Sequence, residues 1–265
     1  MTAHMQINPS QTDFASLAGR VAVITGAGQG IGRVFAKAFA QCGAIVVIAE
    51  RNGSKGDAVA KEIADAKGRA LAVTTDVSDI DSIGRMTTAV EETFGRIDIL
   101  INNAGIFSTL EMRPFDRIPV SEWEQVLRVN VTGPFLCARA VLPAMRRAKR
   151  GRIINMASGV VTMPRPNYLH YIASKGALAG MTGSMARELG PDGITVNAIL
   201  PGATFTEIER KTVSPEQKTR IVAQQCIPRP ETADDLVGTA LFLASDASAF
   251  LTGQSITVDG GATHR

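Results

Sequence analysis

The chain has 265 residues, enough for one large domain or two small ones with a core that needs no disulfide or metal to hold it. Apolar residues make up 45% and charged residues 20%, which is ordinary globular usage and argues against a disordered, collagen-like or coiled-coil architecture. The net charge of +3 is too small to favour nucleic acid or an anionic membrane surface, so we expect neither as a partner.

Short β-branched runs alternate with helical patterns along most of the chain. We predict strands at Val21–Thr25, Ala44–Glu50, Ala70–Thr75, Ile97–Asn102, Arg152–Met156, Ile194–Leu200 and Ser255–Val258. We predict helices near 31–42, 56–67, 79–94, 121–148, 169–189 and 233–245. Several strands are continuously apolar, as in 45–48, which is typical of strands buried on both faces. The order predicts one Rossmann-like, doubly wound α/β domain over 17–265, with a seven-stranded parallel sheet and helices on both faces.

Three other features concern the ends, the loops and the thiols. Residues 1–16 lack Lys, Arg and a long apolar core, so we expect a flexible N-terminal tail and no secretory signal. The irregular stretches 159–167 and 201–232 follow strands, and we expect 203–232 to be a substrate lid. Cys42, Cys137 and Cys226 are far apart and form no CxxC pair, which favours reduced thiols, a cytoplasmic location and no metal site.

A glycine-rich turn follows the first predicted strand. It reads Thr25-Gly-Ala-Gly-Gln-Gly-Ile-Gly32, and a helix is predicted directly after it. Backbone amides at such a helix start bind phosphate, and glycines allow a pyrophosphate to come close. The strict GxGxxG spacing is absent, because Ile31 and Arg33 occupy the third-glycine positions of the two possible registers.

The second strand ends in a carboxylate, Glu50. A carboxylate at this place can accept hydrogen bonds from the adenosine ribose and repel a 2′-phosphate, which favours NAD. Arg51 is the opposing signal, because a guanidinium could hold that phosphate. Gln29 in the glycine turn is not basic, so a second phosphate ligand is missing and NAD remains the favoured cofactor over NADP.

Several motifs in one order make the chain resemble the short-chain dehydrogenase/reductase family. After the glycine turn come Asp76-Val77, Asn102-Asn-Ala-Gly105, Asn130, Ser158, Tyr171-x-x-x-Lys175, Pro201-Gly202 and Asp259-Gly-Gly261. The resemblance covers about 17–261. A single YxxxK is weak, whereas the ordered set with matching spacings is specific.

The resemblance implies a cofactor site and a catalytic tetrad. The implied cofactor residues are Gly26, Gln29, Gly30, Ile31, Gly32, Glu50, Arg51, Asp76, Val77, Asn103, Ala104, Gly105, Tyr171, Lys175, Pro201, Gly202, Thr204 and Thr206. In family terms Asp76 and Val77 contact the adenine, and Pro201-Gly202 with the two threonines holds the nicotinamide carboxamide and the diphosphate. The implied tetrad is Asn130, Ser158, Tyr171 and Lys175, in which Lys175 also holds the nicotinamide ribose and Asn130 positions a relay water.

The chemistry supports that tetrad independently. A free phenol has a pKa of about 10 and is a poor base at neutral pH, whereas a neighbouring ammonium favours the phenolate. Tyr171 and Lys175 are four residues apart and share a helix face. Ser158 ends another strand and could bind the substrate oxygen. Each residue alone has an ordinary structural explanation, and only their combination favours catalysis.

Tyr168 offers a second spacing, Tyr-x6-Lys, which resembles that of divergent enoyl reductases acting on a carbon–carbon double bond. Those relatives carry serine where Gly30 stands here, so we assign Tyr168 to the pocket and keep double-bond reduction as a minor alternative. The expected substrate contacts are Ser158, Val160, Tyr168, Tyr171 and Phe205.

The resulting hypothesis is an NAD-dependent oxidoreductase that transfers a hydride between the cofactor and a secondary alcohol or ketone. One alternative is an NADP-dependent ketone reductase of the 3-oxoacyl type. The alternative from another class is a dinucleotide-binding sensor or scaffold without turnover. The family resemblance also suggests a homotetramer, or a homodimer.

Overall fold

The computed structural model describes residues 17–208 and 215–264, so the predicted tail 1–16 and part of the predicted lid lie outside the described residues. Seven parallel strands form one sheet in the order β3-β2-β1-β4-β5-β6-β7. Their bounds are β1 Val21–Thr25, β2 Ile45–Glu50, β3 Arg69–Thr74, β4 Ile99–Asn102, β5 Gly151–Met156, β6 Ile194–Pro201 and β7 Ser255–Val258. The predicted doubly wound sheet is confirmed.

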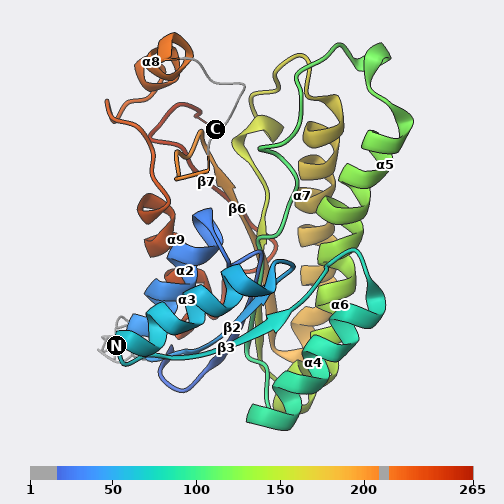
Figure 1. The fold of residues 1–265 in the computed structure, drawn as a ribbon, viewed down its shortest axis with the longest axis vertical. Coiled ribbons are helices and arrows are strands. Elements are labelled where there is room, and N and C mark those ends of the chain that lie inside the picture. Colours follow the sequence, from blue (N-terminus) through green and yellow to red (C-terminus); the bar gives the residue numbers. More distant parts are fainter. Residues whose placement is uncertain (1–16, 209–214, 265) are drawn as a thin grey trace, which may run out of the picture.

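Helices cover both faces of the sheet, as Figure 1 shows. The helices on one face are α2 Gly30–Gln41, α3 Gly53–Asp65 and α9 Asp234–Ala244, and those on the other are α4 Ile80–Phe94, α6 Gly133–Ala148 and α7 Leu169–Leu189. Two shorter helices are α5 Val120–Leu127, which precedes α6, and α8 Pro215–Ala223, which follows β6. Apolar clusters fill both interfaces, with Phe35 and Phe39 of α2 on one side and Met86 and Val141 on the other. Continuous burial of strands such as β1 explains why the sequence shows apolar runs there and no alternation.

The predicted helix 121–148 is wrong as one unbroken helix. A π-helical turn at Arg128–Thr132 separates α5 from α6. A π-turn inserts one extra residue and re-aims the side chains around it, and here it carries the fully buried Asn130. The periodicity of the sequence continues through this turn, which is why the interruption was not predicted.

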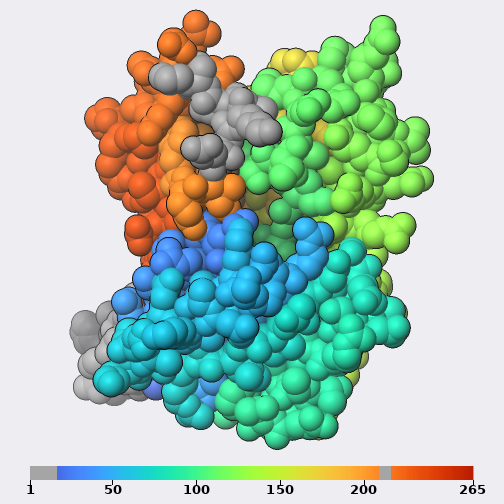
Figure 2. Space-filling view, in the orientation of Figure 1, coloured from blue at the N-terminus to red at the C-terminus, as the bar shows by residue number. Residues whose placement is uncertain are grey.

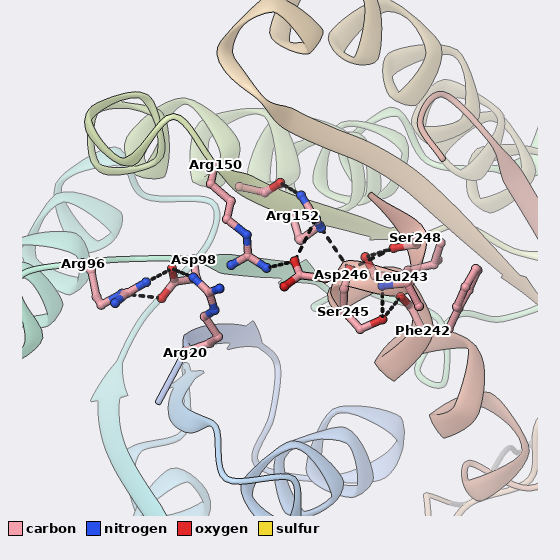
Figure 3. A network of polar contacts seen from close by, with 12 residues as sticks. Arg20, Arg96, Asp98, Arg150, Arg152, Phe242, Leu243, Ser245, Asp246 and Ser248 are labelled. Atoms are coloured by element: carbon pink, nitrogen blue, oxygen red, sulfur yellow. Dashed lines mark hydrogen bonds and ion pairs between the residues drawn. The ribbon is translucent and has the colours of Figure 1, made fainter. Parts of the chain in front are cut away.

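Ion pairs close the edge of the sheet at which the strands begin, opposite the ends that carry the site residues (Figure 3). Asp98 is 2% exposed and accepts hydrogen bonds from the backbone of Val21 and from two guanidinium nitrogens of Arg96, at 2.6–2.9 Å. Arg152 is similarly buried, pairs with Asp246 at 3.4 Å, and has its pKa lowered to about 10 by burial. These contacts stabilise strand starts that would otherwise bury unpaired charge.

None of the helices in the described part of the chain is both long and apolar enough to cross a lipid bilayer.

Candidate active site

A cavity of about 780 Å³ lies at the carboxyl ends of the strands. It includes the crevice between β1 and β4, where the strand order reverses, which is the place where doubly wound sheets bind ligands. In Figure 2 the surface is recessed between the orange segment after β6, the green segment after β4 and the blue amino-terminal elements. Most predicted site residues line this cavity: Gly26, Gln29, Ile31, Glu50, Arg51, Asp76, Val77, Asn103, Ala104, Gly105, Ser158, Val160, Tyr168, Tyr171, Lys175, Pro201, Gly202, Thr204 and Thr206.

Four predicted site residues do not line the cavity: Gly30, Gly32, Asn130 and Phe205. The two glycines lie at the start of α2 and shape the backbone of the turn. The Phe205 ring faces α8, where the Nζ of Lys218 lies 4.7 Å from its centroid. The expected substrate contact of Phe205 stays a prediction.

The glycine turn is held against the end of β4. Thr25 Oγ accepts hydrogen bonds from the backbone amides of Asn103 and Ala104, both at 3.0 Å. The side chain of Asn103 donates in return to the carbonyls of Thr25 and Gly26 at 2.9 and 3.1 Å. A Cβ on Gly32 would lie 2.3 Å from the Gly26 carbonyl oxygen, so the close packing of this turn requires glycine there.

The amino end of α2 binds an oxyanion in this structure. The backbone amide of Gly30 donates to the carboxylate of Glu207 at 2.8 Å. Gly30 has a φ of +57°, and no side chain caps the helix at Gln29. The contact shows that this amide faces outward and satisfies a negatively charged oxygen, as a phosphate-binding helix start requires.

Glu50 is fixed at the end of β2. One carboxylate oxygen accepts from the backbone of Gly28 at 3.1 Å and the other from that of Asn52 at 2.9 Å. Asp76 lies on the neighbouring loop and accepts two hydrogen bonds from Ser78. Burial disfavours ionisation of Asp76, but the Ser78 hydrogen bonds and the charge of Arg51 outweigh it and lower its pKa. Two carboxylates therefore flank one wall of the cavity.

Tyr171 and Lys175 project from the first turns of α7 into the same cavity. Lys175 is 5% exposed, its Nζ donates to the Met156 carbonyl at 2.7 Å, and it lies 5.7 Å from the centre of the Tyr171 ring. Burial lowers the pKa of Lys175 to about 8. Phe107 packs against the Tyr171 ring at 4.5 Å, which limits the rotation of the phenol.

Ser158 follows β5 and lines the cavity together with Tyr171. Within the described residues its hydroxyl has one recorded hydrogen bond, a long one accepted at 3.4 Å from the backbone of Val160. That bond uses an oxygen lone pair and leaves the hydroxyl proton available to a ligand oxygen.

Asn130 binds neighbouring backbone and lies behind the cavity wall. Its side-chain oxygen accepts from the amide of Ile106 at 2.7 Å, and its side-chain nitrogen donates to the Ile106 carbonyl and to Ser174 Oγ, both at 3.1 Å. Ser174 in turn donates to the carbonyl of Tyr171 at 2.7 Å. Asn130 thus joins the loop after β4 to the first turn of α7.

Sequence reasoning missed two acidic residues of this region. Glu207 was not expected at the glycine turn, and no local signal marks it, since it is 177 residues away from Gly30. Glu231 is 4% exposed and accepts from Thr204 Oγ, while burial raises its pKa despite that bond. Glu231 directly follows Pro228-Arg229-Pro230, and such a Pro-rich stretch gives no reason to expect a buried carboxyl.

No group of three or more His, Cys, Asp or Glu side chains in the described ranges is arranged to hold a metal ion. The three thiols at positions 42, 137 and 226 form no disulfide.

Comparisons with known proteins agree with this geometry. Residues 26–263 match the family model described as enoyl-(acyl carrier protein) reductase. The chain is 37% identical to the 3-oxoacyl-[acyl-carrier-protein] reductase of Synechocystis sp., over 94% of this chain and 98% of that protein. It is equally similar, at 37%, to the gluconate 5-dehydrogenase of Gluconobacter oxydans, over 96% of this chain and 98% of that protein. Among solved structures, a 7α-hydroxysteroid dehydrogenase in complex with NADH superposes with a TM-score of 0.91 at 32% identity, covering 98% and 99% of the two chains.

The fold and the site together define a nicotinamide-dependent oxidoreductase. The chain belongs to the short-chain dehydrogenase/reductase family, and the resemblance inferred from its motifs is confirmed.

Proposed function

We propose that this enzyme interconverts a secondary alcohol and a ketone, with Tyr171 as the acid and base and NAD as the cofactor. The observation that carries the proposal is the shared cavity, in which the Tyr171 and Ser158 hydroxyls and Lys175 lie in the same space as the glycine turn. When bound, the nicotinamide supplies or accepts the hydride, and the protein supplies orientation and the proton.

Three side chains handle the substrate oxygen in this proposal. Ser158 donates a hydrogen bond that orients the oxygen. Tyr171 takes its proton during oxidation and returns it during reduction. The ammonium form of Lys175 stabilises the phenolate of Tyr171 and binds the nicotinamide ribose. Tyr171 is preferred to Tyr168 because Tyr168 precedes α7, whereas Tyr171 and Lys175 lie on one face of that helix.

Asn130 acts as a positioning residue. Its three hydrogen bonds hold the loop after β4 against Ser174, and Ser174 binds the backbone of Tyr171. The relay water expected at Asn130 stays a prediction.

The residues around the glycine turn fit a dinucleotide. The Gly30 amide that binds Glu207 would instead bind a diphosphate oxygen. A Cβ on Gly26 would lie 2.8 Å from the Ala104 Cα, so glycine there lets the turn pack against the loop after β4. Asp76 and Val77 would hold the adenine, Asn103, Ala104 and Gly105 would form the adjoining wall, and Pro201, Gly202, Thr204 and Thr206 would hold the nicotinamide end.

Glu50 supports NAD in preference to NADP. Its two backbone hydrogen bonds fix a carboxylate at the end of β2, where it would repel a 2′-phosphate. Lys55 lies beside the turn, where its ammonium donates to the Gln29 side chain, and its positive charge joins that of Arg51 as the opposing signal.

Cofactor choice and reaction are tested together by titrating the purified protein with NADH and with NADPH, followed by a panel of secondary alcohols. We expect tighter binding of NADH, by at least about tenfold, because the carboxylate favours the free ribose. Tighter binding of NADPH would support the NADP-dependent 3-oxoacyl-type reductase instead. Binding without turnover of any alcohol or ketone would favour the sensor or scaffold.

The proposed assembly is a homotetramer, and the reduced thiols support the proposed cytoplasmic location. Apolar side chains on α5, α6 and α7 support the assembly, since Val120, Phe135 and Leu169 are 71%, 49% and 45% exposed. Sedimentation should give a mass of four chains, and Phe135→Glu should give a smaller species with its secondary structure retained. A wild-type monomer would contradict this assembly.

A further inference from the structure

Two arginines line the part of the cavity away from the glycine turn. Arg165 lies on the loop between β5 and α7, and Arg220 lies on α8. These elements stand on opposite sides of the opening, with α8 on the left and the yellow segment that leads into α7 on the right of Figure 1. Both arginines are exposed to solvent and line the cavity that also contains Tyr171.

No partner among residues 17–208 and 215–264 neutralises either guanidinium through a recorded hydrogen bond or ion pair. Arg113 provides the contrast, because it pairs with Glu111 at 2.7 Å and with Glu122 at 3.8 Å. The sequence alone does not tell which of these arginines has an acidic partner, whereas the structure shows that Arg113 has two.

Three carboxylates line the described cavity wall: Glu50, Asp76 and Asp259. Glu50 and Asp76 flank the proposed adenosine site beside β2 and β3. Asp259 accepts hydrogen bonds from the Gly261 amide and from the amide and hydroxyl of Thr263, at 2.7–3.0 Å. None of these three described carboxylates has a recorded ion pair with Arg165 or Arg220.

Apolar side chains line the same cavity as the arginines and the proposed reaction centre: Ile106, Phe107, Met112, Val160, Met163 and Tyr168. Such a wall binds a hydrocarbon or aromatic body, and guanidinium groups at its far end bind an oxyanion through paired hydrogen bonds. The two features together define a ligand with an apolar body and a charged group.

We infer that the substrate is an anionic alcohol or ketone, whose oxyanion is bound by Arg165 and Arg220 while its carbinol or carbonyl carbon faces Tyr171. This inference rests on the proposed function. On oxidation the carbinol C–H bond breaks, its hydride passes to NAD, and the hydroxyl proton passes to Tyr171. The oxyanion takes no part in the bond changes, so its contribution is to binding and orientation.

The test uses three ketones that share a phenyl body. They are 4-oxo-4-phenylbutanoate, its neutral methyl ester, and 3-oxo-3-phenylpropylphosphonate. With NADH, wild-type kcat/KM should be higher for both anions than for the ester, and the advantage should fall as ionic strength rises. A preference for the phosphonate would identify a phosphate-bearing substrate, and a preference for the carboxylate an oxo acid.

Arg165→Met and Arg220→Met should each lower kcat/KM for the anions about three- to fivefold, the upper range for a solvent-exposed Arg–oxyanion pair. The ester should change less than twofold. Arg85→Met removes an arginine on α4 that does not line the cavity and should change neither class of substrate. Equal losses for ester and anions, or no anion preference in the wild type, would overturn the inference.

A binding measurement separates this inference from the proposed function. Calorimetry on the NADH complex with 4-phenylbutanoate and with 4-phenylbutanamide requires no turnover. The carboxylate should bind more tightly to the wild type, and the difference should vanish in the Arg165→Met/Arg220→Met double variant. Anion-selective binding without turnover would leave the anion site intact and reject the proposed reaction, whereas turnover with equal binding of both compounds would reject the anion site alone.

Discussion

Lys175 is a buried ammonium at the proposed reaction centre, with 5% of its surface exposed. Its ammonium has one recorded hydrogen bond, to the carbonyl of Met156, and burial lowers its pKa from 10.5 to about 8. Because this pKa lies close to neutral pH, the protonation state of Lys175 is sensitive to a nearby phenolate or ribose. The lowered pKa also makes the free energy of unfolding depend on pH through this residue.

Folding should become more favourable as pH rises between the two pKa values of Lys175. The folded chain loses the proton near pH 8 and the unfolded chain near 10.5, so the unfolded state binds more protons in this interval. Across this pH interval Lys175 should raise the free energy of unfolding by about 3 kcal/mol in total. Urea unfolding at several pH values should show this rise in the wild type and in Lys61→Met, but not in Lys175→Met. Parallel pH curves for wild type and Lys175→Met would disprove it.

At the scale of elements, the segment after β6 reaches back across the site to the start of α2. Glu207 binds the Gly30 amide, and a Cβ on Gly30 would lie 2.8 Å from the Ile208 side chain. The proposed diphosphate needs the same amide. The carboxylate must therefore withdraw when the cofactor binds, and its withdrawal costs affinity.

Glu207→Gln should bind NADH more tightly, by about fivefold, because a charge-assisted hydrogen bond of about 1 kcal/mol is weakened and charge repulsion is removed. Fluorescence titration of NADH measures this change. Glu92→Gln, on the exposed surface of α4, serves as the control and should leave the dissociation constant unchanged. An unchanged or weaker affinity in Glu207→Gln would show that the contact does not compete with the cofactor.

The elements that could be predicted are those whose own residues determine them. Apolar β-branched runs gave all seven strands, and the bounds of α7 are as predicted, because burial on the sheet dominates these segments. The π-turn at Asn130 and the position of Glu207 could not be predicted, since both depend on contacts between residues distant in sequence. Motif spacing predicted Ser158, Tyr171 and Lys175, which share the cavity, whereas the contact of Phe205 with Lys218 depends on where α8 packs.

At the scale of the whole molecule, the site exists only because parallel winding brings strand ends together. One end of the sheet brings together the glycine turn after β1, Ser158 after β5 and Pro201 at the end of β6. Helix α7 adds Tyr171 and Lys175 to them. The opposite edge is closed by the ion pairs of Asp98 and Asp246 (Figure 3). The ion pairs thus stabilise the end of the sheet at which the strands begin, and the site occupies the end at which they finish.

The central claim is that Tyr171 moves the proton in an NAD-linked interconversion of alcohol and ketone. The most direct measurement compares turnover and NADH binding in the wild type and in Tyr171→Phe, which removes only the phenolic oxygen. Turnover should fall by a factor on the order of 10³, as expected for loss of general acid–base catalysis, while the NADH dissociation constant stays within about twofold. Turnover in Tyr171→Phe close to that of the wild type would contradict the account.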